Sequence, residues 1–98
     1  MTIEMKKTDA EVVLTVSGRL DTSTAPVLDK TINEEVSEQA NLVLDLKELA
    51  YISSAGLRVL LSAQKRMQKR GSMKLKHVCE EVMEVFEMTG FADILVIE

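Results

Sequence analysis

The stretch Leu49-Ala50-Tyr51-Ile52-Ser53-Ser54-Ala55-Gly56-Leu57-Arg58-Val59-Leu60-Leu61 decides how this chain folds. Its pattern predicts the exit of a buried strand, a short turn with two adjacent serines, and the first turns of a helix. Either Ser53 or Ser54 can cap that helix, because the first backbone N–H groups of a helix have no partner within it. The same end carries partial positive charge and tolerates a phosphate. This turn is therefore the first candidate for a functional site.

Upstream of this stretch, the sequence predicts a β-hairpin, a helix and a buried strand. Residues 2–7 and 11–17 alternate or run apolar, and the second run is rich in β-branched side chains, so we expect two paired strands. Residues 24–37 carry apolar side chains at helical spacing, with Pro26 in the first turn, where a missing N–H is harmless. The short apolar run 41–46 is typical of a strand covered on both faces.

Downstream, helices and strands continue to alternate. The helix that begins at the serines is predicted to end at Arg70, with Gly71 in the left-handed conformation beyond it, and its basic last turns complement its own dipole. A half-exposed strand over 72–78, a helix over 80–89 and a final strand over 94–97 complete the chain. The predicted order is ββαβαβαβ, an α/β domain with a largely parallel or mixed sheet.

Length, charge and hydropathy exclude several classes of protein. A chain of 98 residues fits one domain, which we place over residues 1–98. Its net charge of −4 argues against a nucleic-acid binder, which needs a basic face. No apolar run approaches the roughly 20 residues that span a bilayer, and the first residues lack a signal-peptide core. We therefore expect a cytoplasmic protein that does not insert into membranes.

The chain is poor in residues that carry metal or catalytic chemistry. Cys79 is its one cysteine and His77 its one histidine, so a transition-metal site would lack ligands, and we predict no metal and no cofactor. We expect His77 to lie in a strand, and both residues to be structural. Neither serine has a base at identifiable spacing, so we predict that the protein is not an enzyme.

Five motifs stand out along the chain: Gly18-Arg19-Leu20-Asp21, Thr24-Ala25, the strand 42–46, Tyr51-Ile52-Ser53-Ser54-Ala55-Gly56-Leu57 and Phe86-Glu87-Met88-Thr89-Gly90-Phe91. In their order and spacing, these motifs resemble the STAS domain of bacterial anti-sigma factor antagonists. The resemblance covers nearly the whole chain. It implies a single STAS domain: a small mixed β-sheet with helices packed mainly on one side.

The resemblance also implies a function, which is partner switching. In this family the unphosphorylated protein binds an anti-sigma factor that is also a serine kinase, and this binding frees the sigma factor. Phosphorylation of the serine that opens the second helix ends the binding, and a serine phosphatase restores it. By position, the phosphorylated residue is Ser54.

Five further residues are implied as partner contacts: Asp21, Ser53, Ala55, Gly56 and Arg58. Two positions depart from the common family pattern. Ser53 replaces an aspartate, and Arg58 stands where a small residue is usual. Because Arg58 follows Ser54 by four residues, the two should share one helix face, where the guanidinium could pair with a phosphoserine or with an acidic partner, or stay solvated.

A second interpretation stays within the same fold. The chain could instead be a STAS subunit that holds a larger assembly together, such as the cytoplasmic subunit of a lipid ABC transporter. In that case Ser54 would serve as an interface residue or a helix cap, and phosphorylation would play no part.

Overall fold

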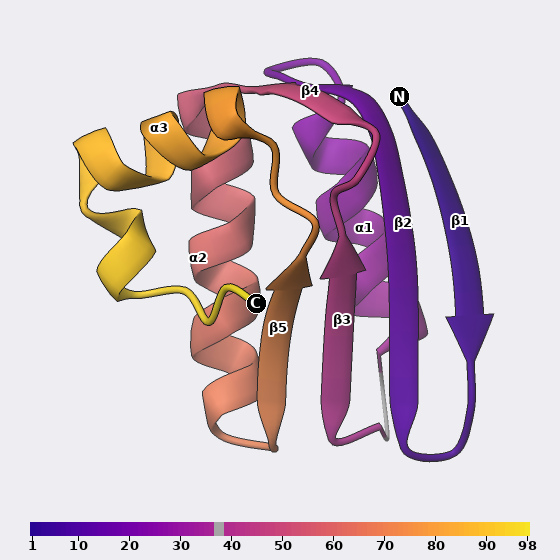
Figure 1. The fold of residues 1–98 in the computed structure, drawn as a ribbon. Coiled ribbons are helices and arrows are strands. Elements are labelled where there is room, and N and C mark those ends of the chain that lie inside the picture. Colours follow the sequence, from indigo (N-terminus) through magenta and orange to yellow (C-terminus); the bar gives the residue numbers. More distant parts are fainter. Residues whose placement is uncertain (37–38) are drawn as a thin grey trace.

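Strands and helices alternate along the chain, as Figure 1 shows for the computed structural model, which describes residues 1–36 and 39–98. In chain order the elements are β1 (Thr2–Lys7), β2 (Glu11–Leu20), α1 (Ala25–Glu35), β3 (Asn41–Asp45), β4 (Leu49–Ile52), α2 (Ser54–Gln68), β5 (Ser72–Lys76), α3 (Glu80–Thr89) and the 3₁₀ helix η1 (Phe91–Asp93). The predicted α/β class is confirmed.

The long strand β2 organises a mixed five-stranded sheet. β1 pairs with it antiparallel, and β3 runs parallel to its first half, with β5 parallel to β3 on the outside. β4 runs parallel to the last part of β2, where the register shifts between Gly18 and Arg19. The two halves of β2 therefore have different neighbours on the same side.

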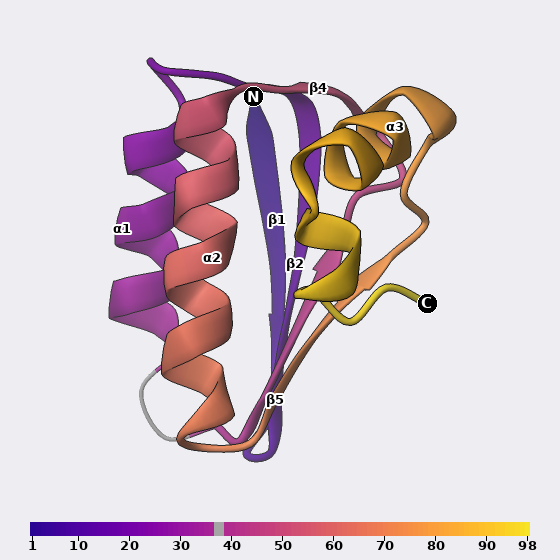
Figure 2. The same cartoon turned by 90° about the vertical axis from the view of Figure 1, so that its left-hand side faces the viewer.

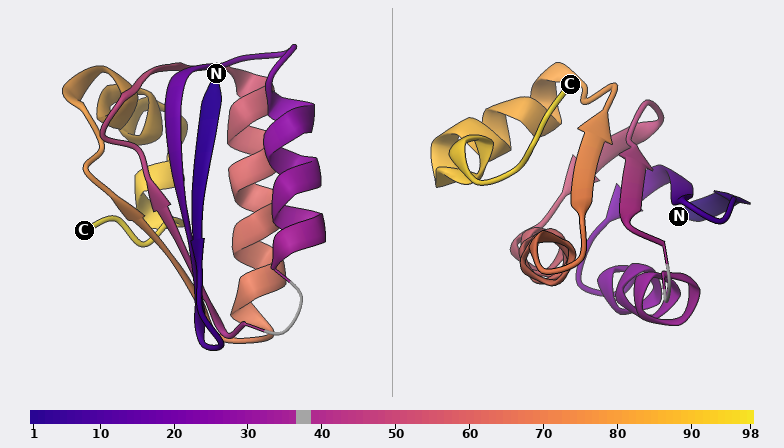
Figure 3. Two further views of the ribbon diagram at one scale, coloured as in Figure 1. Left: turned by 90° about the vertical axis from the view of Figure 1, so that its right-hand side faces the viewer. Right: turned by 90° about the horizontal axis from the view of Figure 1, so that it is seen from below.

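The core lies between the sheet and two parallel helices. Strand pairing aligns fully buried side chains in two rows across the sheet: Val12, Leu42 and Met73, then Leu14, Leu44 and Leu75. Helices α1 and α2 cover this face, as predicted, whereas α3 and η1 lie on the opposite side (Figures 2 and 3). α3 buries Val82 and Phe86. Burying such apolar side chains is the main favourable term in folding.

The predicted order ββαβαβαβ is wrong in two places, and the observed order is ββαββαβα. Residues 49–52 form a separate strand, because the chain turns at 47–48 and then pairs with the end of β2. The predicted strand 94–97 is reduced to an isolated bridge between Leu75 and Ile97. The 3₁₀ helix Phe91–Asp93 directly precedes this segment, and the N–H groups of Ile94 and Leu95 donate back to the carbonyl of Phe91 instead of to a neighbouring strand.

Most element boundaries agree with the predictions, with corrections of a few residues. β1 and α3 have the predicted bounds, and Gly90 ends α3 in the left-handed conformation. The first helix spans Ala25–Glu35 instead of 24–37, and the predicted end at Ser37 lies outside the described residues.

The residues on either side of β5 depart from the prediction. α2 ends at Gln68 rather than Arg70, and Gly71 does not have a positive φ. A Cβ on Gly71 would lie 1.9 Å from the carbonyl oxygen of Ala40, so close approach of two backbones requires the glycine. His77 lies just beyond β5 with a φ of 58°, outside the strand in which it was expected.

Candidate functional site

The serine turn joins the end of β4 to the start of α2. The backbone N–H of Ser53 donates to the carbonyl of Leu20 at 2.9 Å, which fixes the turn beside the end of β2. Ser53 is the N-cap of α2, and its hydroxyl accepts a hydrogen bond from the N–H of Gly56 at 3.5 Å. Ser54 is the first residue of the helix and is exposed. Capping therefore falls to Ser53 and leaves the Ser54 hydroxyl at the surface.

Gly56 and Ala55 hold the start of α2 against the sheet. Gly56 is buried, and a Cβ there would lie 2.8 Å from side-chain carbons of both Ile52 and Leu20. Ala55 is half-buried and packs against the core. Gly56 is therefore placed as a packing residue under the surface that carries Ser54.

Asp21 organises the loop beside the serine turn. Its Oδ1 accepts hydrogen bonds from the Ser23 N–H at 3.0 Å, the Ser23 hydroxyl at 2.8 Å and the Thr24 N–H at 3.1 Å. The Ser23 hydroxyl first, then the other donors, lower the pKa of the Asp21 carboxyl below its ordinary value. Because Leu20 bonds to Ser53, this loop and the serine turn are neighbours at one end of the sheet. Asp21 is therefore ionised and already hydrogen-bonded within its own loop.

Arg19 and Tyr51 form a stacked pair at the border of this site, which the sequence did not predict to be in contact. The guanidinium of Arg19 lies 4.1 Å from the centre of the Tyr51 ring, and Arg19 Nε lies 3.9 Å from Asp21 Oδ2. Arg19 and Tyr51 are cross-strand partners in the β2–β4 ladder. The pair could not be found without recognising β4 as a strand, since no local pattern links residues 32 positions apart.

Arg58 lies on the exposed side of α2, four residues after Ser54. Within residues 1–36 and 39–98, no hydrogen bond or ion pair joins its guanidinium to another side chain. The helix has no acidic residue in its first turn. Ser54 and Arg58 thus share a helix face to which α2 itself contributes no negative charge.

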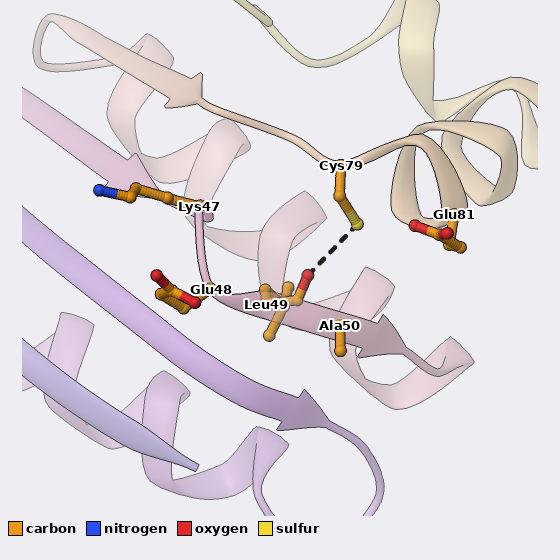
Figure 4. A pocket seen from close by; sticks show the side chains of 6 residues that line it. All are labelled: Lys47, Glu48, Leu49, Ala50, Cys79 and Glu81. Atoms are coloured by element: carbon orange, nitrogen blue, oxygen red, sulfur yellow. Dashed lines mark hydrogen bonds between the residues drawn. The ribbon is translucent and has the colours of Figure 1, made fainter.

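An open pocket of about 470 Å³ lies away from these residues. It is lined by Lys47, Glu48, Leu49, Ala50, Cys79 and Glu81, between the turn before β4 and the start of α3 (Figure 4). The Cys79 thiol donates to the carbonyl of Leu49 at 3.4 Å, which links the start of α3 to β4. None of the six predicted site residues lines the pocket.

The described part of the chain contains neither a metal cluster nor a membrane-spanning helix. No group of three or more His, Cys, Asp or Glu side chains in residues 1–36 and 39–98 is arranged to hold a metal ion. In the same residues, no helix combines the length and the apolar character that crossing a membrane requires. The serine turn, with its exposed hydroxyl and arginine, is the candidate surface for protein contacts.

Comparison with known proteins places this arrangement in a family. The STAS domain profile matches residues 2–98. The anti-sigma-B factor antagonist of Bacillus subtilis (strain 168) is 30% identical over 94 residues, which cover 95% of this chain and 86% of that protein. A crystal structure of an anti-sigma factor antagonist from Mycobacterium paratuberculosis superposes with a TM-score of 0.87 at 25% identity, covering 98% of this chain and 83% of that one.

The fold is also that of SpoIIAA, an anti-sigma factor antagonist solved in two states. Its unphosphorylated form gives a TM-score of 0.84 at 17% identity, covering 99% of this chain and 88% of that one. Its phosphorylated form gives a TM-score of 0.77 at 16% identity, covering 99% of this chain and 91% of that one. Anti-sigma factor antagonists are non-enzymatic regulators, in agreement with the prediction that this chain is not an enzyme. By its profile match, its full-length relatives and its fold, the chain belongs to the STAS domain family, among the anti-sigma factor antagonists.

Proposed function

We propose that this protein binds an anti-sigma factor with serine kinase activity in the cytoplasm and thereby releases a sigma factor. Phosphorylation of Ser54 ends the binding, and a serine phosphatase restores it. The contact surface centres on Ser54 and includes Asp21, Ser53, Ala55 and Arg58, while the buried Gly56 sets the position of the helix start.

The exposed, uncommitted hydroxyl of Ser54 is the observation that carries the proposal. Ser53 caps α2, so Ser54 is not needed for capping. Within residues 1–36 and 39–98, no hydrogen bond engages the Ser54 hydroxyl. A kinase can therefore approach this oxygen without disturbing the fold.

Electrostatics explain how one phosphate can act as a switch. A phosphate adds about −1.5 to −2 charge at pH 7 and is tolerated at a helix start, so the domain stays folded. A partner that packs on the neutral Ser54 would have to bury that charge, and the effective penalty is several kcal/mol per unpaired ion. Since about 1.4 kcal/mol is a tenfold change in affinity, binding would fall by two or more orders of magnitude.

Phosphorylation with a kinase of the anti-sigma type from the same genome tests the assignment. With ATP, the parent protein should gain one phosphate, which mass spectrometry locates at Ser54. Ser62→Ala is the matched control, because Ser62 is an exposed serine two turns further along α2 and its variant should be modified normally. Ser54→Ala that is still fully modified would contradict the assignment.

A second experiment tests the switch separately from the kinase reaction. Ser54→Asp should weaken binding to the same kinase at least tenfold while the circular dichroism spectrum stays unchanged, because Ser54 is exposed. Equal binding of the Asp variant and the parent would contradict the electrostatic switch. Tight binding to a transporter ATPase, unaffected by either substitution, would favour the alternative of a structural STAS subunit.

A further inference from the structure

Arg58 differs from the other arginines because, within the described residues 1–36 and 39–98, its guanidinium has no hydrogen-bond, ion-pair or ring partner. Arg19 stacks on Tyr51, and Arg66 and Arg70 donate to carbonyl oxygens near the end of α1. Arg58 is exposed, and within residues 1–36 and 39–98 nothing accepts its N–H groups. A guanidinium with five free donors at this point is suited to an incoming anion.

Helix geometry brings Ser54 within reach of Arg58. Residues four apart lie on one helix face with Cβ atoms about 5–6 Å apart, within reach of an arginine and a phosphoserine. Ser54 and Arg58 both belong to the regular part of α2 and both are exposed. α2 contains no Asp or Glu, so no carboxylate on this helix competes for the guanidinium.

We propose that Arg58 pairs with the phosphate on Ser54 and positions it along the exposed face of α2. This inference rests on the proposed function, because that function brings the phosphate to Ser54. Pairing occupies the guanidinium, so a partner's carboxylate that contacts Arg58 in the unphosphorylated protein loses its cation. Phosphorylation would then both add an anion to the surface and withdraw a cation from it.

The test installs phosphoserine at position 54 during synthesis, so that no kinase is needed. The second ionisation of the phosphate, with a pKa of about 6 for a free phosphoserine, is followed by ³¹P NMR. Arg58→Gln should raise this pKa by about 0.3 or more, as expected for loss of a helix ion pair with a dianion. Lys65→Gln is the matched control: it removes the same charge from the exposed face of α2, but Lys65 lies about 16 Å along the helix from Ser54, beyond the screening length.

Conservative variants and a folding control complete the design. In the Arg58→Lys protein the phosphate pKa should lie between the values of the parent and of Arg58→Gln. Lysine keeps the positive charge but lacks the two parallel N–H donors of the guanidinium. Circular dichroism of each variant without phosphate checks that the exposed substitution leaves the fold intact. Equal pKa values in the Arg58→Gln and Lys65→Gln proteins would overturn the proposal. Because the phosphate is installed chemically, that result would leave kinase action on Ser54 unaffected, and a failure of the kinase would leave the pairing measurable.

Discussion

Gly56 shows how one residue fixes the position of the candidate site. The start of α2 approaches β2 and β4 so closely that even a methyl group has no room: a Cβ on Gly56 would lie 2.8 Å from side-chain carbons of Ile52 and Leu20 and 3.0 Å from the Leu20 carbonyl oxygen. Gly56→Ala should therefore lower the free energy of unfolding by about 1–3 kcal/mol through overpacking. This loss is expected despite the roughly 1 kcal/mol by which alanine exceeds glycine in helix propensity.

Urea denaturation measures the effect of Gly56→Ala, with Ser62→Ala as the control. Ser62 is exposed on the same helix, so its variant should stay within about 0.5 kcal/mol of the parent. An increase in stability for Gly56→Ala would mean that propensity outweighs packing, and that the start of α2 can shift outward. In that case the position of Ser54 would not depend on Gly56.

The two serines show what a local pattern can and cannot decide. Their presence before an apolar helical run is enough to predict a capped helix start. Which serine caps depends on where β4 ends, and that is set by the hydrogen bond from Ser53 to Leu20, which is distant in the sequence. The sequence favours Ser53 as the cap but allows the two serines to exchange roles, and the fold confirms Ser53 as the cap.

At the scale of elements, the last turn of α2 and the residues just after it secure the end of α1. Arg66 donates to the Asn33 side chain at 2.5 Å and to the Val36 carbonyl at 2.7 Å, and Arg70 donates to Val36 at 3.1 Å. The bonds to Val36 satisfy a carbonyl oxygen that a helix end leaves without a partner. Lys65 and Arg66 lie in the last turn of α2, in keeping with the expected complement to the dipole of that helix. Arg66, together with Arg70 just beyond the helix end, also contacts the end of α1.

Arg66→Ala should destabilise the protein by about 1.5–3 kcal/mol, because hydrogen bonds from a charged group are lost and the Val36 carbonyl keeps only Arg70. Thermal unfolding followed by circular dichroism measures the loss. Lys65→Ala, at the adjacent exposed position, should change stability by no more than about 0.5 kcal/mol. If Lys65→Ala loses as much stability as Arg66→Ala, the loss comes from removing a positive charge from the last turn of α2 and not from breaking the contact with α1.

At the scale of the whole molecule, a contact between β3 and the turn after β5 links stability to pH. His77 Nδ1 lies 3.0 Å from Asp45 Oδ1, and the Lys47 N–H donates to the same oxygen at 3.1 Å. Burial raises the pKa of the Asp45 carboxyl, but these hydrogen bonds and the nearby positive charges outweigh it, so the pKa is lowered.

The sign of the pH dependence follows from this lowered pKa. The unfolded chain binds a proton at Asp45 with a pKa of about 3.9, above the folded value, so the contribution is present above about pH 4 and is lost as the pH falls through the folded pKa. Asp45→Asn should lower stability at pH 7 by about 0.5–1.5 kcal/mol and make the loss of stability below about pH 4 less steep. Urea titrations from acidic to neutral pH measure both.

Asp9→Asn serves as the control for this experiment, since Asp9 is an exposed carboxylate in the turn between β1 and β2. Its variant should follow the acid profile of the parent. If the free energy of unfolding falls with pH equally steeply below about pH 4 in the Asp45 variant and in the parent, another carboxyl group governs acid unfolding.

The sequence predicted the class of the fold better than its connections. Apolar patterns located β1, β2, β3 and α3, and the last three of these bury regular apolar positions in the core. Residues 49–52 were predicted as the exit of a buried strand, and their being a separate strand β4 was missed because only Leu49 and Ile52 of the four are buried, which is no strand alternation. The candidate site was located from the serines and from the resemblance, while the Arg19–Tyr51 pair next to it depends on strand pairing that no local pattern encodes.

The serine turn depends on hydrogen bonds with β2, a strand distant in the sequence, and this limits how an enzyme can recognise Ser54. The Ser53 N–H bonds to Leu20, and the N–H of Gly18 bonds to the carbonyl of Glu48, so the shape of the turn exists only when β2 is in place. A short synthetic peptide that carries Ser54 has the sequence of the site but lacks β2, so it does not adopt the conformation of the turn. An enzyme that modifies Ser54 would therefore have to read the surface of the folded domain, and peptide arrays would miss this substrate.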